Sequence, residues 1–143
     1  MESMTDPGTG QATQGCPTAT NSSKVLVGGQ ELRLHEVQRG IDFIFGLGQD
    51  ALVAIPMRRV SCIRSGALPN FHELSLLSFL ELQRLPVLLE VELGSAKQSC
   101  WLLNVVEGWL RITTRFGVEW TPAASLVMAK VGAVDNSPRL FAS

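Results

Sequence analysis

The stretch Val-Leu-Leu-Glu-Val-Glu-Leu at residues 87–93 alternates apolar with mostly polar side chains. Alternation with a period of two predicts a β-strand with one buried face and one solvated face. The same texture continues to residue 131, so we expect this part of the chain to be built of strands. The expected strands are residues 87–93, 99–106, 109–114, 118–121 and 126–131.

Short β-rich runs also fill the chain before this stretch. Glycine-containing turns separate these runs, as expected for strands joined by tight connections. The sequence therefore predicts a mainly β protein. The expected strands are residues 24–27, 31–37, 41–47, 51–55 and 60–63.

The two strand-rich regions show the same order of features. Residues 37–40 align with residues 105–108, and each ends in a glycine followed by an apolar strand. A second strand then ends at Pro56 in one copy and at Pro122 in the other. Strand, turn, strand, proline and strand is the order that a small barrel needs to bend its sheet through a corner. Two such matches can arise by chance, but we predict an internal duplication that gives two barrel modules.

A single helix is expected between the two regions. Asn70 is a suitable N-cap, Glu73 can complete a capping box, and Pro86 ends the segment at Arg84. Its apolar side chains cover more than one face, so we expect the helix to lie between both modules. These apolar residues are Phe71, Leu74, Leu76, Leu77, Phe79, Leu80 and Leu82.

The sequence divides into five segments. The first, rich in Thr, Ser, Gln, Gly and Pro, has too few apolar side chains to offset chain entropy. We expect a disordered tail, a first β module, a connecting helix, a second β module and a C-terminal tail. Their bounds are residues 1–23, 24–68, 69–86, 87–134 and 135–143.

The order of elements from residue 70 to 131 resembles the Sm-like fold, in which a helix precedes a bent five-stranded barrel. The resemblance rests on the helix, residues 87–93, the run Trp-Leu-Leu-Asn-Val-Val-Glu-Gly-Trp-Leu-Arg-Ile at 101–112, and a strand pair around Pro122. Residues 24–66 look like a degenerate copy. The resemblance implies two small SH3/Sm-like barrels and assembly through sheet edges.

The RNA-binding motifs of Sm proteins do not carry over to this chain. Those proteins have Asp-x-x-Met-Asn after the second strand and Arg-Gly before the last one. The corresponding residues here are Glu-Gly-Trp-Leu at 107–110 and Thr-Pro-Ala at 121–123. The resemblance therefore implies a fold and no ligand.

Charge and cysteine content favour a cytoplasmic protein that does not bind membranes. The net charge is −1, so no global field attracts nucleic acid or anionic lipid. The first 23 residues lack the basic and apolar regions of a signal peptide, and no long apolar run follows. Cys16, Cys62 and Cys100 suit reduced thiols better than a disulfide framework. We expect Cys62 and Cys100 to be small core residues, with redox chemistry as the alternative.

No residue pattern predicts catalysis, a metal, a cofactor or a small-molecule substrate. His35 and His72 are the only histidines, and the sequence places no ligand or nucleophile partners near them. Glycine-rich pieces such as residues 46–48 lack the spacing of a phosphate cradle.

The strongest charged feature is in the first module. Arg58, Arg59 and Arg64 fall close together, and Arg33 and Arg39 can join them. Guanidinium groups bind phosphates or carboxylates, so these five residues are the candidate binding site. The alternative interpretation is a solvated loop and strand edge.

Three tryptophans lie in the second module, namely Trp101, Trp109 and Trp120. We expect them to pack in the core or between modules. A base-stacking platform is the alternative, but such platforms have interleaved basic residues, and the neighbours here are Glu107 and Glu119.

These observations predict a non-catalytic interaction module, an adaptor or regulatory protein that binds another protein or forms a homo-oligomer. Unpaired strands at the edges of a small sheet commonly pair with other chains. The alternative is weak RNA or DNA binding through the arginines of the first module.

Overall fold

The computed structural model describes residues 22–132, and its secondary structure is mainly β, as the sequence predicts. Eleven strands form one sheet within this range, accompanied by one short α-helix. The strands are β2 (Ser22–Val27), β3 (Gln30–Arg39), β4 (Phe43–Leu47), β5 (Leu52–Pro56), β6 (Val60–Arg64), β7 (Asn70–Phe71), β8 (Val87–Leu93), β9 (Ala96–Val106), β10 (Trp109–Thr114), β11 (Gly117–Pro122) and β12 (Leu126–Val131). The helix is α2 (Leu76–Glu81), and the 3₁₀ turns are η1 (Met57–Arg59) and η2 (Ala123–Ser125).

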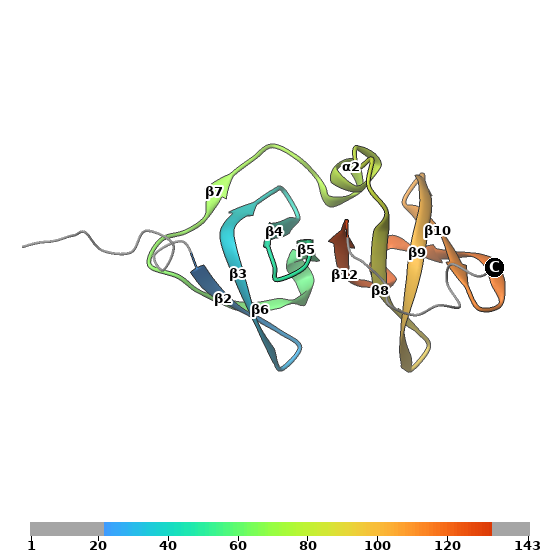
Figure 1. Cartoon of the computed structure of the whole chain (residues 1–143), viewed down its shortest axis with the longest axis horizontal. Coiled ribbons are helices and arrows are strands. Elements are labelled where there is room, and N and C mark those ends of the chain that lie inside the picture. Colours follow the sequence, from blue (N-terminus) through green and yellow to red (C-terminus); the bar gives the residue numbers. More distant parts are fainter. Residues whose placement is uncertain (1–21, 133–143) are drawn as a thin grey trace, which may run out of the picture.

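The sheet runs continuously through the molecule. Its strand order is β11-β10-β9-β8-β12-β5-β4-β3-β2-β6, and all of these neighbours are antiparallel. The short strand β7 pairs in parallel with β3. Two groups of strands therefore lie side by side, with β5 and β12 between them and α2 above that junction (Figure 1).

The first half, strands β2 to β6, and the second half, strands β8 to β12, have the same order of elements. In the first half, β5 ends at Pro56, η1 follows, and β6 returns to pair with β2. In the second half, β11 ends at Pro122, η2 follows, and β12 returns to pair with β8. The prolines aligned in the sequence thus occupy equivalent places. The strand order is open, ending at β11 and β6, so closed barrels and a duplication stay predictions.

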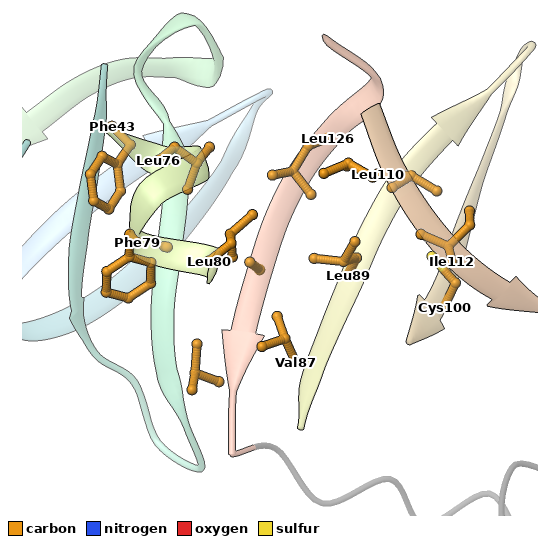
Figure 2. Packing of buried hydrophobic residues seen from close by; sticks show 14 residues of the cluster. Phe43, Leu76, Phe79, Leu80, Val87, Leu89, Cys100, Leu110, Ile112 and Leu126 are labelled. Atoms are coloured by element: carbon orange, nitrogen blue, oxygen red, sulfur yellow. The ribbon is translucent and has the colours of Figure 1, made fainter. Parts of the chain in front are cut away.

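The cores of the two halves are not separate. One cluster of buried side chains joins Phe43 and Ala54 of the first half to α2 and to the second half (Figure 2). The other cluster lies in the first half but includes Val127 and Met128 of β12. A bulge between Leu126 and Met128 in the pairing with β8 accounts for two successive residues joining one cluster. Strand β12 therefore contributes to both cores.

The helix is shorter than predicted, and the predicted N-cap at Asn70 is wrong. Asn70 and Phe71 form β7 against β3, and the amide of Ile41 donates to the carbonyl of Leu74 at 2.8 Å. Those bonds hold the segment before the helix in an extended form. The actual N-cap is Ser75, whose Oγ accepts from the amide of Ser78 at 3.2 Å.

The helix packs on both halves through one face only. Leu76, Phe79 and Leu80 are buried, and the Phe79 ring centroid lies 5.2 Å from that of Phe43. Leu82 is 67% exposed, so the helix perimeter is not fully covered.

The predicted tails fall mostly on residues 1–21 and 133–143, outside the described residues. The predicted first tail includes Ser22 and Ser23, but these residues belong to β2 and pair with His35 and Leu34. Among the helices in the described range, none combines the length and apolar character needed to cross a membrane.

Candidate functional site

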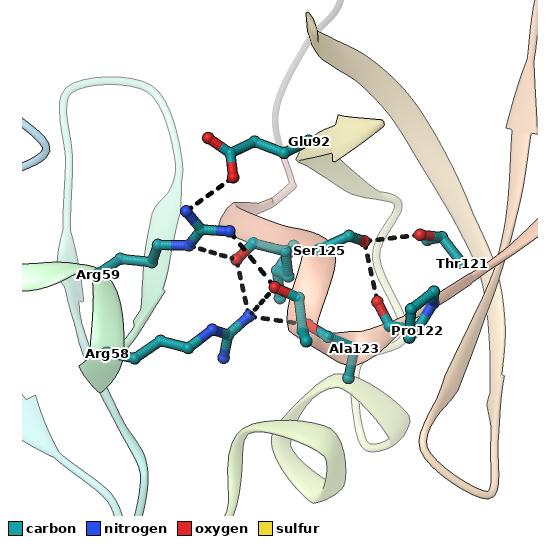
Figure 3. A network of polar contacts seen from close by, with 9 residues as sticks. Arg58, Arg59, Glu92, Thr121, Pro122, Ala123 and Ser125 are labelled. Carbon is teal, nitrogen blue, oxygen red and sulfur yellow. Dashed lines mark hydrogen bonds and ion pairs between the residues drawn. The ribbon is translucent and has the colours of Figure 1, made fainter. Parts of the chain in front are cut away.

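Two of the five predicted arginines connect the halves of the protein (Figure 3). Arg58 and Arg59 lie in η1, directly after β5, and their side chains reach the 3₁₀ turn η2. Arg58 Nη2 donates to the carbonyl oxygens of Ala123, Ala124 and Leu126 at 3.0, 2.6 and 3.1 Å. Arg59 donates to the carbonyls of Ala124 and Leu126 at 3.3 and 3.2 Å.

The electrostatic surroundings of the two guanidinium groups differ. Arg59 Nη1 lies 2.9 Å from a carboxylate oxygen of Glu92 on β8. Partial burial lowers the pKa of Arg58, the neighbouring charge of Arg59 lowers it further, and Asp42 acts in the opposite direction. Both side chains therefore have partners inside the chain. These partners lie far away in sequence, so the closeness of Arg58 and Arg59 along the chain could not predict them.

Arg39, a third predicted arginine, also contacts other residues of the chain. Arg39 Nε donates to the carbonyl of Pro69 at 2.9 Å, and its guanidinium carbon lies 5.1 Å from the centroid of the Phe71 ring. These contacts fasten the segment around β7 to the end of β3.

The two remaining arginines lie on one exposed face with a lysine that the sequence did not single out. Lys24 on β2 is directly opposite Arg33 on β3 and also directly opposite Arg64 on β6. Directly opposed residues point to the same side of a sheet, and all three are exposed. We call Arg33, Lys24 and Arg64 the basic ladder. Arg64 also lies 3.4 Å from a carboxylate oxygen of Glu31.

The tryptophans are not the core residues that we expected. Trp109 and Trp120 are 48% and 52% exposed, and Trp101 is half-buried. Trp109 is opposite Pro122, and Arg111 is opposite Trp120. We call the outward side chains of β10 and β11 the tryptophan face; its residues are Trp109, Arg111, Val118, Trp120 and Pro122, all exposed.

The acidic neighbours that argued against a tryptophan surface do not interrupt it. Glu119 precedes Trp120 on the strand, so its side chain points to the opposite side of the sheet. Glu107 lies in the turn before β10, with a positive φ of 49°. Arg111 lies between the two tryptophans and has no ion-pair partner among residues 22–132. Within the described residues, the face is thus apolar apart from Arg111.

The tryptophan face borders an edge of the sheet that is open among the described residues. Strand β11 pairs with β10 on one side and ends the strand order on the other. Thr114 and Gly117 close a two-residue turn, so Gly117, Glu119 and Thr121 direct their backbone groups to β10. Val118 and Trp120, which alternate with them, direct their N–H and C=O groups to the open edge. Pro122 lacks a donor there.

A groove of about 650 Å³ lies between the two halves. Its charged lining mixes both signs, with Arg33, His35 and Lys130 against Glu31, Asp50 and Glu90. No group of three His, Cys, Asp or Glu side chains in the described residues is arranged to hold a metal ion. Among the described residues, the groove therefore has no cluster of side chains of one charge that could bind a charged ligand.

The two described cysteines differ from each other. Cys100 is fully buried, as expected, and burial together with the charge of Glu119 raises the pKa of its thiol to about 11. Cys62 is exposed on the edge strand β6, so its expected place in the core is wrong. The sequence around Cys62 is apolar at Val60 and Ile63, which are only half-buried.

Comparison with known proteins found no matching family model, no matching curated protein and no matching solved structure.

Proposed function

We propose that this protein is a non-catalytic interaction module, an adaptor or regulatory protein that binds another protein through the tryptophan face and the open edge of β11. The observation that carries the proposal is the pair of half-exposed tryptophans, Trp109 and Trp120, beside the outer edge of β11, which pairs with no strand among residues 22–132. Tryptophan and arginine are the residues most enriched where binding energy concentrates in protein interfaces.

Backbone chemistry supports an extended partner. Val118 and Trp120 offer two amide donors and two carbonyl acceptors in a row, which an added β-strand would satisfy. Edge strands that avoid such pairing usually carry charged side chains or proline, whereas the outward residues Val118 and Trp120 are uncharged and proline occurs only at the end of β11, at Pro122.

Charge supports a more specific chemistry for the partner. Arg111 lies between the tryptophans without an ion-pair partner in the described range. A partner strand that packs apolar side chains on Trp120 and brings a carboxylate to Arg111 would satisfy the whole face. We therefore propose an extended segment with apolar residues and at least one acidic residue.

We also propose that the two halves are SH3/Sm-like barrel modules related by duplication. The repeated order of strands, with a proline and a 3₁₀ turn before the last strand of each half, supports this view. The free thiols of Cys62 and Cys100 support a cytoplasmic location.

Site-specific photo-crosslinking tests the binding proposal. A photoreactive residue at Val118 should capture a partner from native lysate, whereas the same group at Leu68, 72% exposed in the other half, should not. Trp120→Lys should abolish the capture, and Leu68→Lys should leave it unchanged. Arg111→Glu should weaken it more than Lys97→Glu, a matched charge reversal on β9.

Light scattering on the same samples shows whether the captured partner is a second copy of the chain. Equal capture from both positions, or equal loss in Trp120→Lys and Leu68→Lys, would contradict the proposed face. A strict monomer that captures nothing would contradict the proposed function.

A further inference from the structure

We propose that the basic ladder, Arg33, Lys24 and Arg64, is a second and independent site that binds the phosphate backbone of a single nucleic-acid strand. The three cations lie on three adjacent strands in direct register, with Lys24 in the middle. They are far from the tryptophan face in the strand order, at the opposite end of the sheet.

The basic ladder destabilises the sheet unless an anion binds to it. Like charges directly opposite each other across strands destabilise a sheet. Lys24 faces a cation on each side, and neither Lys24 nor Arg33 has an ion-pair partner in the described part of the chain. Bound phosphates would remove this repulsion.

The shape of the ladder favours a thin polyanion. Neighbouring strands are about 4.8 Å apart, so the three cations span roughly 10 Å in a line across the strands. A nucleic-acid strand presents its phosphates in a row, whereas an anionic membrane would contact a broad area.

The neighbouring side chains predict binding without sequence preference. Leu26 and Glu31 are opposite each other in the next row of β2 and β3 that points outward, and His35 is opposite Ser22 in the row on the other side. None of these is a tryptophan, tyrosine or phenylalanine on which bases could stack, so binding would rest on phosphate contacts, which carry no sequence information. RNA and DNA strands should therefore bind with similar affinity.

Glu31 should weaken phosphate binding at one end of the basic ladder. Its carboxylate lies 3.4 Å from Arg64 Nη1, with the two side chains 44% and 62% exposed. A phosphate reaching Arg64 must compete with this carboxylate. Removing the charge of Glu31 should therefore strengthen binding.

Fluorescence anisotropy with labelled fifteen-residue oligo(dT) and oligo(U) tests the proposal on the full chain. Three phosphate contacts on a single strand predict a slope of log affinity against log salt of about −2, a loss of roughly 20-fold between 50 and 200 mM salt. Lys24→Gln should lower the affinity several-fold and reduce the slope by about 0.7. Lys97→Gln, the same change on exposed β9, should do neither, and Glu31→Gln should tighten binding a few-fold.

Other outcomes would overturn the site. Undetectable binding at 20 mM salt, or equal losses in Lys24→Gln and Lys97→Gln, would show that the ladder binds no nucleic acid. A larger loss in Trp120→Ala than in Lys24→Gln would move the nucleic acid to the tryptophan face. Binding to vesicles of anionic lipid without binding to either oligonucleotide would replace the nucleic acid by a membrane. Circular dichroism confirms that each variant is folded.

Discussion

Arg58 Nη2 lies 2.6 Å from the carbonyl oxygen of Ala124, and this contact joins the 3₁₀ turn of the first half to that of the second. The same nitrogen also reaches the carbonyls of Ala123 and Leu126. Carbonyl groups at the end of a helical turn lack partners within the turn, and a guanidinium group satisfies several at once. A residue that the sequence suggested for ligand binding therefore fastens two parts of the fold.

Arg58→Ala should lower the free energy of unfolding by about 1–3 kcal/mol, because it removes hydrogen bonds from a charged donor to three carbonyls. Urea denaturation followed by tryptophan fluorescence measures the change. Arg115→Ala is the matched control, since Arg115 is exposed in the β10–β11 turn, where its guanidinium carbon lies 4.9 Å from the centroid of the Phe116 ring. A loss in Arg58→Ala no larger than that in Arg115→Ala would show that the contact contributes nothing.

The two described thiols should react very differently. Burial raises the pKa of Cys100 to about 11, whereas Cys62 is exposed. At pH 8, iodoacetamide should label Cys62 within minutes and leave Cys100 unlabelled until the protein unfolds. Peptide mass spectrometry locates the label. Rapid labelling of Cys100 in the folded protein would contradict its burial.

The pKa of Cys100 also predicts how stability changes with pH. The pKa of the folded thiol is raised above its usual value of 9.0, so the contribution of this thiol to stability is complete below pH 9 and is lost as the pH rises toward 11. The loss should be on the order of 2 kcal/mol. Cys100→Ala should lack this part of the alkaline decline, which denaturation at pH 8 and pH 10.5 can detect. Identical slopes in both proteins would contradict the assignment.

The mainly β class and most strand positions could be predicted, because alternation and glycine turns are local signals. The helix start could not be predicted, because the pairing of Asn70 with Gln38 on β3 decides it. Local capping preference favoured a helix from Asn70, but a long-range strand contact was stronger.

The candidate sites could be predicted even less well, because they depend on which strands pair and in which register. Lys24, Arg33 and Arg64 are distant in sequence, and only the pairing of β2 with both β3 and β6 brings them into one row. Arg58 and Arg59 looked like a basic patch because their carbonyl partners, in η2 and at Leu126 of β12, lie in the other half of the chain. Alternation along β11 did contain the signal that separates Glu119 from Trp120.

Gly40→Ala should destabilise the protein by more than about 2 kcal/mol. A Cβ at this position would overlap the ring of Phe43 and the carbonyl oxygen of Leu74. Gly66→Ala is the control, because a Cβ there meets open space and the backbone needs no left-handed conformation. Thermal denaturation of both variants gives the comparison. A stable Gly40→Ala protein would mean that the segment before α2 is free to move away.

Neither half of the protein should fold alone, because each core is completed by the other half. Residues 66–143 without the first half would lose Phe43 and Ala54 from their core and the pairing of β5 with β12. The first half without the second would lose Val127 and Met128. Circular dichroism of the two fragments should show no cooperative melting for either one.

In the full chain, the junction should unfold as one unit. Leu80 is 3% exposed in the shared core, so Leu80→Ala should cost about 2–4 kcal/mol. Leu82→Ala, at the exposed C-cap of the same helix, is the control and should cost less than about 0.5 kcal/mol. The Leu80→Ala loss should appear in a single transition by fluorescence and by circular dichroism, because β12 packs in both cores. Two separate transitions, or a sharp melt of residues 66–143 alone, would mean that the halves are independent and that β12 and α2 belong to the second half only.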